Sequence, residues 1–405
     1  MAVLILKIYL IVVILILLVY AVRHFTFTIN RISGEQRLYY QDIIDSEYPF
    51  VSVLLPMHNE EKVARDLLEA LVHNDYPLDH LEIIPINDHS DDRTADIINE
   101  FAAGYPQVRP MHRTEDDQKR GKQAALNDAL EVCRGEIIIV FDADYVPQKG
   151  TLRDLAISFK DPQVGAVMGR VVPKNTEKNL LTRLLDLERS GGYQVDQQAR
   201  HNMMLVPQYG GTVGGFRKSI VDSFGGFDTR VLAEDTDLTF LLYTRGWKVS
   251  YANRVECYEE SPENWISRST QIFRWSRGHN HVLFKHFFAV IRSPYLRFAE
   301  KFDGLLLLCL YLIPFFILSG MIDSMILFFL GEMQIIESIF VFFFVAGYRG
   351  NTYGYGAAAS GCESDSKQRT PNHRGSTRLR RRRPHGIRRR CRASRRCGVR
   401  RPQGA

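Results

Sequence analysis

The sequence predicts an α/β fold with a mostly parallel sheet, and three buried strands that alternate with helices support this prediction. Apolar runs at residues 51–56, 81–86 and 136–141 have the length and composition of buried strands. Segments with helical spacing of apolar residues follow or precede them over short connections. Strands that alternate with helices in this way are typical of a parallel sheet covered by helices on both faces.

The helical segments are expected at residues 60–72, 93–101 and 121–133. The second begins after Ser90-Asp91-Asp92, whose short polar side chains are common helix caps. The polar turn at residues 56–61, directly after the first strand, contains no Gly-x-Gly-x-x-Gly motif. A dinucleotide-binding Rossmann enzyme is therefore disfavoured.

The net charge of +6 is the sum of two unlike parts. From Arg349 onward the chain has 17 lysine and arginine residues but only two acidic ones, an excess of +15. The preceding 348 residues therefore carry a net charge of −9, and an acidic body does not indicate a nucleic-acid partner. The six cysteines show no Cys-x-x-Cys spacing, which argues against a zinc site or a disulfide framework and fits a reducing compartment.

A first membrane-spanning helix is expected at residues 1–22, which are almost wholly apolar apart from Lys7. A signal peptide is the alternative, but no small-x-small cleavage site follows the apolar run. Arg23, Arg31 and Arg37 lie on the carboxyl side of this span, in the linker expected at residues 23–49, against Lys7 near its other end. By the positive-inside rule these arginines place the domain that follows the linker in the cytoplasm.

A second membrane region is expected at residues 303–348, which would make the chain a multi-pass protein of the plasma membrane. Pro314, Gly320 and Asp323 interrupt its apolar sequence and permit a broken helix whose Asp323 faces protein rather than lipid. Residues 349–405 form a basic tail of arginine, glycine and serine. Because the composition changes abruptly within a membrane-like helix, a frameshift artefact is favoured over a functional basic arm.

Carboxylates follow two of the predicted strands at the point where each strand ends. Asp88 follows the second strand, and Asp142-Ala143-Asp144 follows the third. The carboxyl ends of parallel strands are where open α/β sheets bind ligands. A solvated turn is the simplest explanation of an isolated Asp-x-Asp. At a strand end, however, two carboxylates suit a divalent cation that also binds phosphate oxygens.

Two further motifs follow in the second half of the domain. Ala233-Glu234-Asp235 opens a helical run, where the carboxylates could simply complement the helix dipole. Gln271-Ile272-Phe273-Arg274-Trp275 lies within an amphipathic segment at residues 261–292, which is expected to lie at the membrane surface. Trp275 can offer an apolar face to a sugar ring, and the guanidinium of Arg274 can bind phosphate.

This ordered set of motifs resembles the family 2 glycosyltransferases with a GT-A fold, and in particular their membrane-embedded, processive branch. That branch includes cellulose, hyaluronan, chitin and poly-N-acetylglucosamine synthases. The resemblance covers roughly residues 50–345, with a catalytic GT-A domain at residues 50–260. Two departures are His89, where the family often has glycine, and Ala233, where it has threonine.

The resemblance implies roles for the motif residues at the donor side of the site. Asp88 would contact the nucleoside, and Lys122 of the basic segment at residues 119–127 would offset the charge of the diphosphate. Asp142 would be shared between the nucleotide sugar and a Mg²⁺ or Mn²⁺ ion. Asp144 would be the principal metal ligand.

The resemblance also implies the roles at the acceptor side. Asp235 would be the catalytic base, while Gln271, Arg274 and Trp275 would bind the acceptor and the diphosphate. The glycine-rich segment at residues 210–216 would border the acceptor, although a turn without a role is nearly as plausible.

The implied function is an inverting transfer of sugar from a nucleotide-diphosphate sugar, with a UDP-sugar expected, to a growing polysaccharide at the cytoplasmic membrane face. The expected partners are the nucleotide sugar, the glycan acceptor and the lipid bilayer, with no nucleic acid. Two alternatives stay open. One is a single-transfer glycosyltransferase acting on a lipid-linked acceptor, and the other is an inactive membrane scaffold that keeps the fold.

Overall fold

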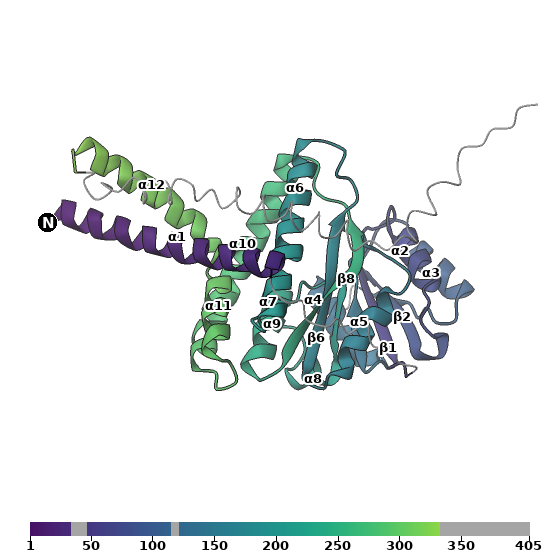
Figure 1. Cartoon of the computed structure of the whole chain (residues 1–405). Helices are drawn as coiled ribbons and strands as arrows, with labels where there is room; N and C mark the ends of the chain where they lie inside the picture. Colours follow the sequence, from purple (N-terminus) through teal and green to yellow (C-terminus); the bar gives the residue numbers. More distant parts are fainter. Residues whose placement is uncertain (34–46, 115–120, 333–405) are drawn as a thin grey trace, which may run out of the picture. The chain divides into compact units, whose positions relative to one another are not determined.

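The computed structural model describes residues 1–33, 47–114 and 121–332. These residues form a long N-terminal helix, an α/β domain and a group of C-terminal helices (Figure 1). The apolar run at residues 335–348 and the basic tail at residues 349–405 lie outside the described residues. So do Lys119 and Arg120 of the basic segment.

Among the described residues, eight strands form one sheet in the order β3-β2-β1-β4-β7-β6-β8-β5. The strands are β1 (Val51–Met57), β2 (Leu81–Asp88), β3 (Met111–Arg113), β4 (Ile137–Val140), β5 (Val146–Pro147), β6 (Val164–Pro173), β7 (Gly214–Arg217) and β8 (Lys248–Glu259). The three strands predicted from apolar runs are β1, β2 and β4, and they pair in parallel. β6 and β8 are also parallel.

The sheet is mixed rather than mostly parallel, because β7 runs antiparallel to both of its neighbours, β4 and β6. β5 is likewise antiparallel to β8. The sequence of β7 is Gly-Gly-Phe-Arg, which lacks the apolar run that marks a buried strand and which was expected to be a small-residue segment or turn. Its pairing is therefore set by tertiary packing, and the prediction for this half of the sheet was wrong.

Helices cover both faces of the sheet, as the alternation of strands and helices predicts (Figure 1). They are α2 (Ala64–Val72), α3 (Thr94–Gly104), α4 (Lys122–Val132), α5 (Thr151–Ala156), α6 (Leu180–Ser190), α7 (Gln198–Asn202), α8 (Lys218–Ser223), α9 (Glu234–Thr244), α10 (Trp265–Arg292) and α11 (Phe298–Leu308). A π-helical segment, Gly191–Gln197, joins α6 to α7.

Alternate residues of the central strands enter two separate hydrophobic cores. Val53 and Leu55 of β1 pack with α2 and α3 on one face, whereas Leu54 packs with α4, α9 and α10 on the other. This alternation follows from the two-residue period of a strand. Each central strand is apolar on both sides because both of its faces are buried.

The N-terminal helix α1 extends over Ala2–Ser33, past the expected end of the span at residue 22. No proline or glycine interrupts this stretch, so the helix continues into its polar segment. Of the helices in the described part, α1 and the segment Leu310–Phe329 are long and apolar enough to cross a membrane, with hydropathies of 3.3 and 2.1. The latter contains α12 (Ile313–Phe329).

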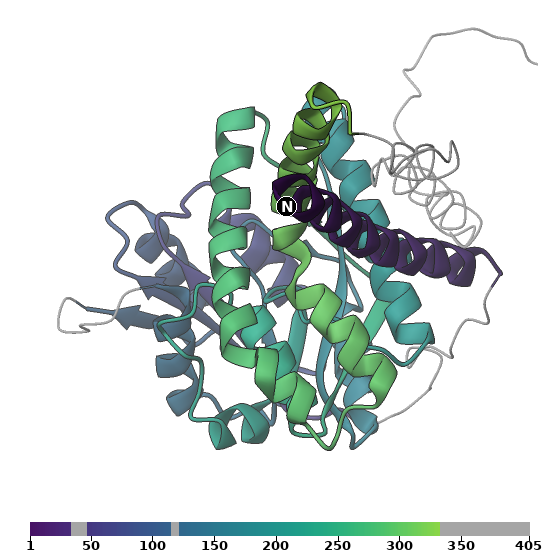
Figure 2. The same cartoon turned by 90° about the vertical axis from the view of Figure 1, so that its left-hand side faces the viewer.

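α1 and α12 pack side by side (Figure 2). Gly320 of α12 lets the helices approach closely, since a Cβ atom there would lie 2.8 Å from Val13 Cγ1. Lys7 pairs with Glu332 at 2.8 Å near one end of the helix pair. Small residues at such crossings are a common feature of packed membrane helices.

The carboxyl-terminal part of α1 is fixed to the α/β domain and α11 by buried charges. Arg23 Nε donates to Asp303 Oδ1 of α11 at 2.7 Å, and Arg200 of α7 lies 3.3 Å from the second oxygen of the same carboxylate. Both guanidinium groups lie over the ring of Phe27. These ion pairs place α11 and α7 directly beside the end of the apolar segment of α1.

Gly215 in β7 offers a test of why this strand is glycine-rich. A Cβ atom at Gly215 would lie 2.5 Å from Ile138 O, a backbone atom of the neighbouring strand. We expect Gly215→Ala to lower the free energy of unfolding by about 1–3 kcal/mol through overpacking. Gly104→Ala is the control, because nothing lies within 4 Å of its Cβ position. Denaturant unfolding of the purified variants would measure the difference, and equal stabilities would contradict the explanation.

Candidate active site

The predicted donor-side residues meet at the carboxyl edge of the sheet, where Lys122 lies between two acidic segments. Its ammonium group is 2.7 Å from Asp142 Oδ1, just past β4, and 3.2 Å from Glu234 Oε1 at the start of α9. It also donates to the carbonyl oxygen of Gly211 at 2.9 Å. One cation therefore joins three segments that are far apart in the sequence.

The position of Lys122 is set by the turn that begins α4. Gly121, the residue before it, has a φ angle of 102°, a conformation that favours glycine. Burial alone lowers the pKa of Lys122, but the charges of Asp142 and Glu234 outweigh it and raise the pKa well above its usual value. The side chain is therefore a permanent cation.

Asp88 is the last residue of β2 and is held by three donors. Gly121 N donates to its Oδ2 at 3.0 Å, while Arg113 and His89 bind its Oδ1. Burial raises the pKa of Asp88, but the hydrogen bonds from His89 and Gly121 and the charge of Arg113 outweigh it, so the pKa is lowered. Asp88 is thus an ionised anchor between β2, β3 and the start of α4.

His89, which stands where the family often has glycine, is part of this anchor. It has a φ angle of 60° and bridges Asp88 to the carbonyl oxygen of Thr114 at 2.7 Å. Sequence patterns did not indicate Arg113, because a single arginine in a three-residue edge strand carries no distinctive signal. The departure from the family's usual glycine therefore has a structural use.

Asp142 and Asp144 follow β4 in a turn. The amide of Asp142 donates to Thr212 Oγ1 at 3.1 Å, which ties this turn to the glycine-rich segment. Burial, together with the charge of Asp142, raises the pKa of Asp144 to about 6. Among the residues that the structure describes, Asp144 forms no ion pair within 4 Å.

This pair of carboxylates fits a shared metal ion. Within the described ranges, no three His, Cys, Asp or Glu side chains gather closely enough to form a metal site by themselves. Two carboxylates, with phosphate oxygens and water completing the coordination, are the usual arrangement for Mg²⁺ bound with a nucleotide. Asp142 and Asp144 provide such a pair beside the cation Lys122.

Asp235 lies in the first turn of α9, next to Glu234. Burial, and then the charge of Glu234, raises the pKa of Asp235 to about 7 despite hydrogen bonds from the amide and hydroxyl of Thr236. Gly211 lies directly against it, because a Cβ atom at Gly211 would be 3.1 Å from Asp235 Cβ. The glycine-rich segment therefore does border Asp235.

α10, which carries Gln271, Arg274 and Trp275, packs against the residues just before Asp235. Gly278, one turn further along α10, packs against Ala233, with 3.0 Å between its Cβ position and Ala233 Cβ. Alanine in place of the family's threonine thus lies at this close helix contact. Arg274 is exposed, and it forms no ion pair with another described residue.

The ring of Trp275 lies close to two arginines. The guanidinium carbons of Arg189 and Arg268 are 5.3 and 5.2 Å from the ring centroid. Arg268 also donates to Gln271 Oε1 at 2.7 Å. Neither arginine was predicted as a site residue, since neither lies in a recognisable motif.

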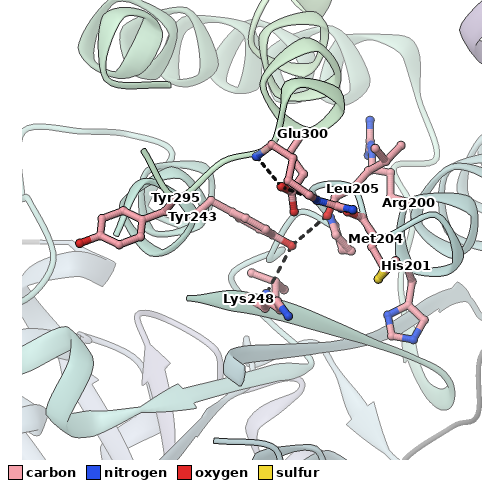
Figure 3. Close-up of a pocket in the computed structure, with 11 residues that line it drawn as sticks. Arg200, His201, Met204, Leu205, Tyr243, Lys248, Tyr295 and Glu300 are labelled. Atoms are coloured by element: carbon pink, nitrogen blue, oxygen red, sulfur yellow. Dashed lines mark hydrogen bonds and ion pairs between the residues drawn. The ribbon is translucent and has the colours of Figure 1, made fainter. Parts of the chain in front are cut away.

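A cavity of about 350 Å³ lies at the opposite edge of the sheet, beside the first residues of β8 (Figure 3). Its charged groups are already paired: Arg297 Nε donates to Glu300 at 3.0 Å, and Lys248 donates to Gln163. The hydroxyl of Tyr243 donates to Leu205 O at 3.3 Å. None of the predicted site residues lines this cavity.

Residues 49–278 match the family described as glycosyltransferase like family 2. The chain belongs to this family. Its α/β domain has the GT-A fold with a mixed sheet.

The chain is similar to the probable glycosyltransferase YdaM of Bacillus subtilis (strain 168), with 38% identity over 240 residues. The match covers 59% of this chain and 57% of that protein. The beta-monoglucosyldiacylglycerol synthase of Nostoc sp. (strain PCC 7120 / SAG 25.82 / UTEX 2576) is 30% identical over 277 residues, covering 68% of this chain and 58% of that protein. The chain therefore spans a little over half the length of these relatives.

A solved structure shares the fold. The mannosyltransferase PcManGT from Pyrobaculum calidifontis, in complex with GDP-Man and Mn²⁺, is similar with a TM-score of 0.59 and 21% identity. The match covers 88% of this chain and 100% of that one.

The contact between Gly211 and Asp235 generates a prediction about activity. Gly211 and Gly225 both have positive φ angles, 73° and 84°, but nothing lies within 4 Å of the Cβ position of Gly225. Alanine at either position should strain the backbone by roughly 1–2 kcal/mol. Because only Gly211→Ala crowds Asp235, we expect it alone to lower the release of nucleoside diphosphate, by roughly 10-fold or more. Equal activity of the two variants would contradict this.

Proposed function

We propose that this glycosyltransferase transfers a sugar, with inversion, from a nucleotide-diphosphate sugar to a hydroxyl acceptor at a membrane surface. The observation that carries the proposal is the cluster at the carboxyl edge of the sheet. It combines a permanent cation, Lys122, with a metal-suited carboxylate pair and a carboxylate of raised pKa, Asp235. These are the groups that a displacement at a sugar diphosphate requires.

The donor half of this site divides between a metal ion and Lys122. Asp144 and Asp142 would hold Mg²⁺ or Mn²⁺, which supplies charge neutralisation for the leaving diphosphate when bound. Lys122 adds a second positive charge to the same group. Asp88, at the neighbouring strand end, would contact the nucleoside.

The acceptor half centres on Asp235. A general base works best when its pKa is near the operating pH, and the pKa of about 7 fits that role. In a single displacement, the acceptor oxygen forms the new bond to the sugar carbon while the bond to the diphosphate breaks. The hydroxyl proton passes to Asp235, and attack opposite the leaving group inverts the configuration.

The acceptor is proposed to be a lipid-borne hydroxyl. Relatives that are about 30% identical are named beta-monoglucosyldiacylglycerol synthases, and their alignments cover 68% of this chain. The two candidate membrane spans and the exposed apolar side chains of α10, including Phe273 and Phe284, support a site close to lipid. Trp275, Gln271 and Arg274 would then bind the acceptor headgroup and the diphosphate.

A growing polysaccharide is the second candidate acceptor. The motif Gln271-x-x-Arg274-Trp275, followed by an apolar helix, favours it, since processive members of the family share that order. The same arrangement would place the domain at residues 50–260 on the cytoplasmic face. The helix α1, the amphipathic α10 and the C-terminal helices would then hold it at the plasma membrane.

Membranes that contain the chain can test the donor, metal and acceptor together. We expect one of a panel of radiolabelled UDP- and GDP-sugars to label an organic-soluble glycolipid in the presence of diacylglycerol and Mn²⁺. Excess EDTA and Asp144→Asn should each abolish labelling, whereas Asp79→Asn, an exposed carboxylate before β2, should not. Label in insoluble polymer would favour the second candidate. Full activity in EDTA, or no turnover of any donor, would contradict the proposal.

The raised pKa of Asp235 predicts a pH profile. The base must be deprotonated to act, so kcat/KM should rise with pH up to an apparent pKa near 7 and then level off. Asp235→Asn should lose about 10²–10⁴-fold in rate and lose this acidic limb, while still binding UDP or GDP. An acidic limb that persists in Asp235→Asn would assign the titration to another group.

A further inference from the structure

A chain of buried contacts leads from the metal-suited carboxylates to Trp275, and no motif predicts it. Tyr145 directly follows Asp144, and its hydroxyl donates to Glu259 Oε2 at 2.6 Å. Glu259 is the last residue of β8 and is only 5% exposed. The turn that carries Asp144 is therefore held in place, through Tyr145, by a carboxylate of strand β8.

The same carboxylate holds the arginine that contacts Trp275. Arg189 of α6 donates to Glu259 Oε1 from Nε at 2.7 Å and to Oε2 from Nη2 at 3.2 Å. This two-point geometry fixes the plane of the guanidinium group. Arg189 then lies with its guanidinium carbon 5.3 Å from the centroid of Trp275.

The second arginine close to Trp275 is also held by α6. Glu188, next to Arg189 on α6, accepts two hydrogen bonds from Arg268, whose guanidinium carbon is 5.2 Å from the same ring. α6 therefore positions both cations that contact Trp275. Through Glu259, this assembly is continuous with the turn of Asp144.

The protonation states are consistent with a persistent network. Burial, and then the charge of Glu259, raises the pKa of Tyr145 well above its usual value, so the phenol keeps its proton and donates it to the hydrogen bond. Burial lowers the pKa of Arg189, but the charge of Glu259 outweighs it and the pKa is raised. Neither group titrates in the physiological range.

We propose that Glu259 is a positioning residue that sets the distance and orientation between the metal-binding turn and the acceptor platform at Trp275. The inference rests on the proposed function and deepens it. Glu259 is not expected to touch the reacting atoms. Its two oxygens instead fix Tyr145 on the donor side and Arg189 on the acceptor side, so that both substrates are held in one geometry.

Three conservative variants separate the two arms. Tyr145→Phe removes only the hydroxyl on the donor side, and Arg189→Lys removes the two-point contact on the acceptor side. Glu259→Gln weakens both. Glu256→Gln is the matched control, because Glu256 also lies in β8 and also pairs with an arginine, Arg170, but lies outside the network.

Two readouts in the full chain follow the two arms. The first is the Mn²⁺ concentration that gives half-maximal donor turnover, and the second is the ratio of sugar transfer to donor hydrolysis by water. Tyr145→Phe should raise the half-maximal Mn²⁺ concentration about 10-fold, because loss of a group that supports a metal ligand typically weakens metal binding by that much. Arg189→Lys should lower the ratio of sugar transfer to donor hydrolysis roughly 10-fold. Glu259→Gln should change both, and Glu256→Gln neither.

Several outcomes would overturn the inference. If Glu259→Gln gives the same two readouts as Glu256→Gln and differs from it only in thermal stability, Glu259 has a structural role and no positioning role. If Glu259→Gln does not fold, the other two variants decide, and failure of Tyr145→Phe and Arg189→Lys to shift their separate readouts rejects the network. Absence of donor turnover in the unaltered chain would instead reject the proposed function, and the positioning role with it.

Discussion

The arrangement of the site depends on one ammonium group, that of Lys122. Its contacts to Asp142, Glu234 and Gly211 hold together the end of β4, the first turn of α9 and the glycine-rich segment before β7. Carboxylates gathered this closely repel one another, and burial adds a desolvation cost. The attraction of a cation at their centre offsets both costs. When they bind, an anionic diphosphate can pair with Lys122 and a metal cation can pair with the carboxylates. The two ligands would then replace the ion pairs that the site forms with itself.

The half of the fold that the sequence predicted well is the half in which local patterns carry the information. β1, β2 and β4 are apolar on both faces, and the helices between them repeat with the expected spacing. The other half depends on tertiary contacts. β7 is a strand because its glycines fit against the backbones of Ile138 and Val167, which a sequence pattern does not reveal. The predicted mostly parallel sheet is accordingly mixed.

The candidate site follows the same division. The structure brings together Asp88, Lys122, Asp142, Asp144 and Asp235, which the ordered motifs had indicated. The groups behind them could not be predicted, because Tyr145 and Glu259 are 114 positions apart and Arg189 and Glu259 are 70 apart. These partners lie in no motif and become neighbours only once β8 and α6 are in place. The buried pair of Arg23 and Asp303 similarly joins α1 to a residue 280 positions away.

The central claim is that the Lys122 cluster binds the diphosphate and its metal ion, and a structure of the full chain with UDP or GDP and Mn²⁺ tests it most directly. The anomalous signal of Mn²⁺ locates the ion without reference to any mechanism. The account predicts a single strong peak within coordination distance of Asp144 and Asp142, with the diphosphate next to Lys122. A peak elsewhere, or a diphosphate bound at the opposite edge of the sheet beside Lys248 and Arg297, would contradict it.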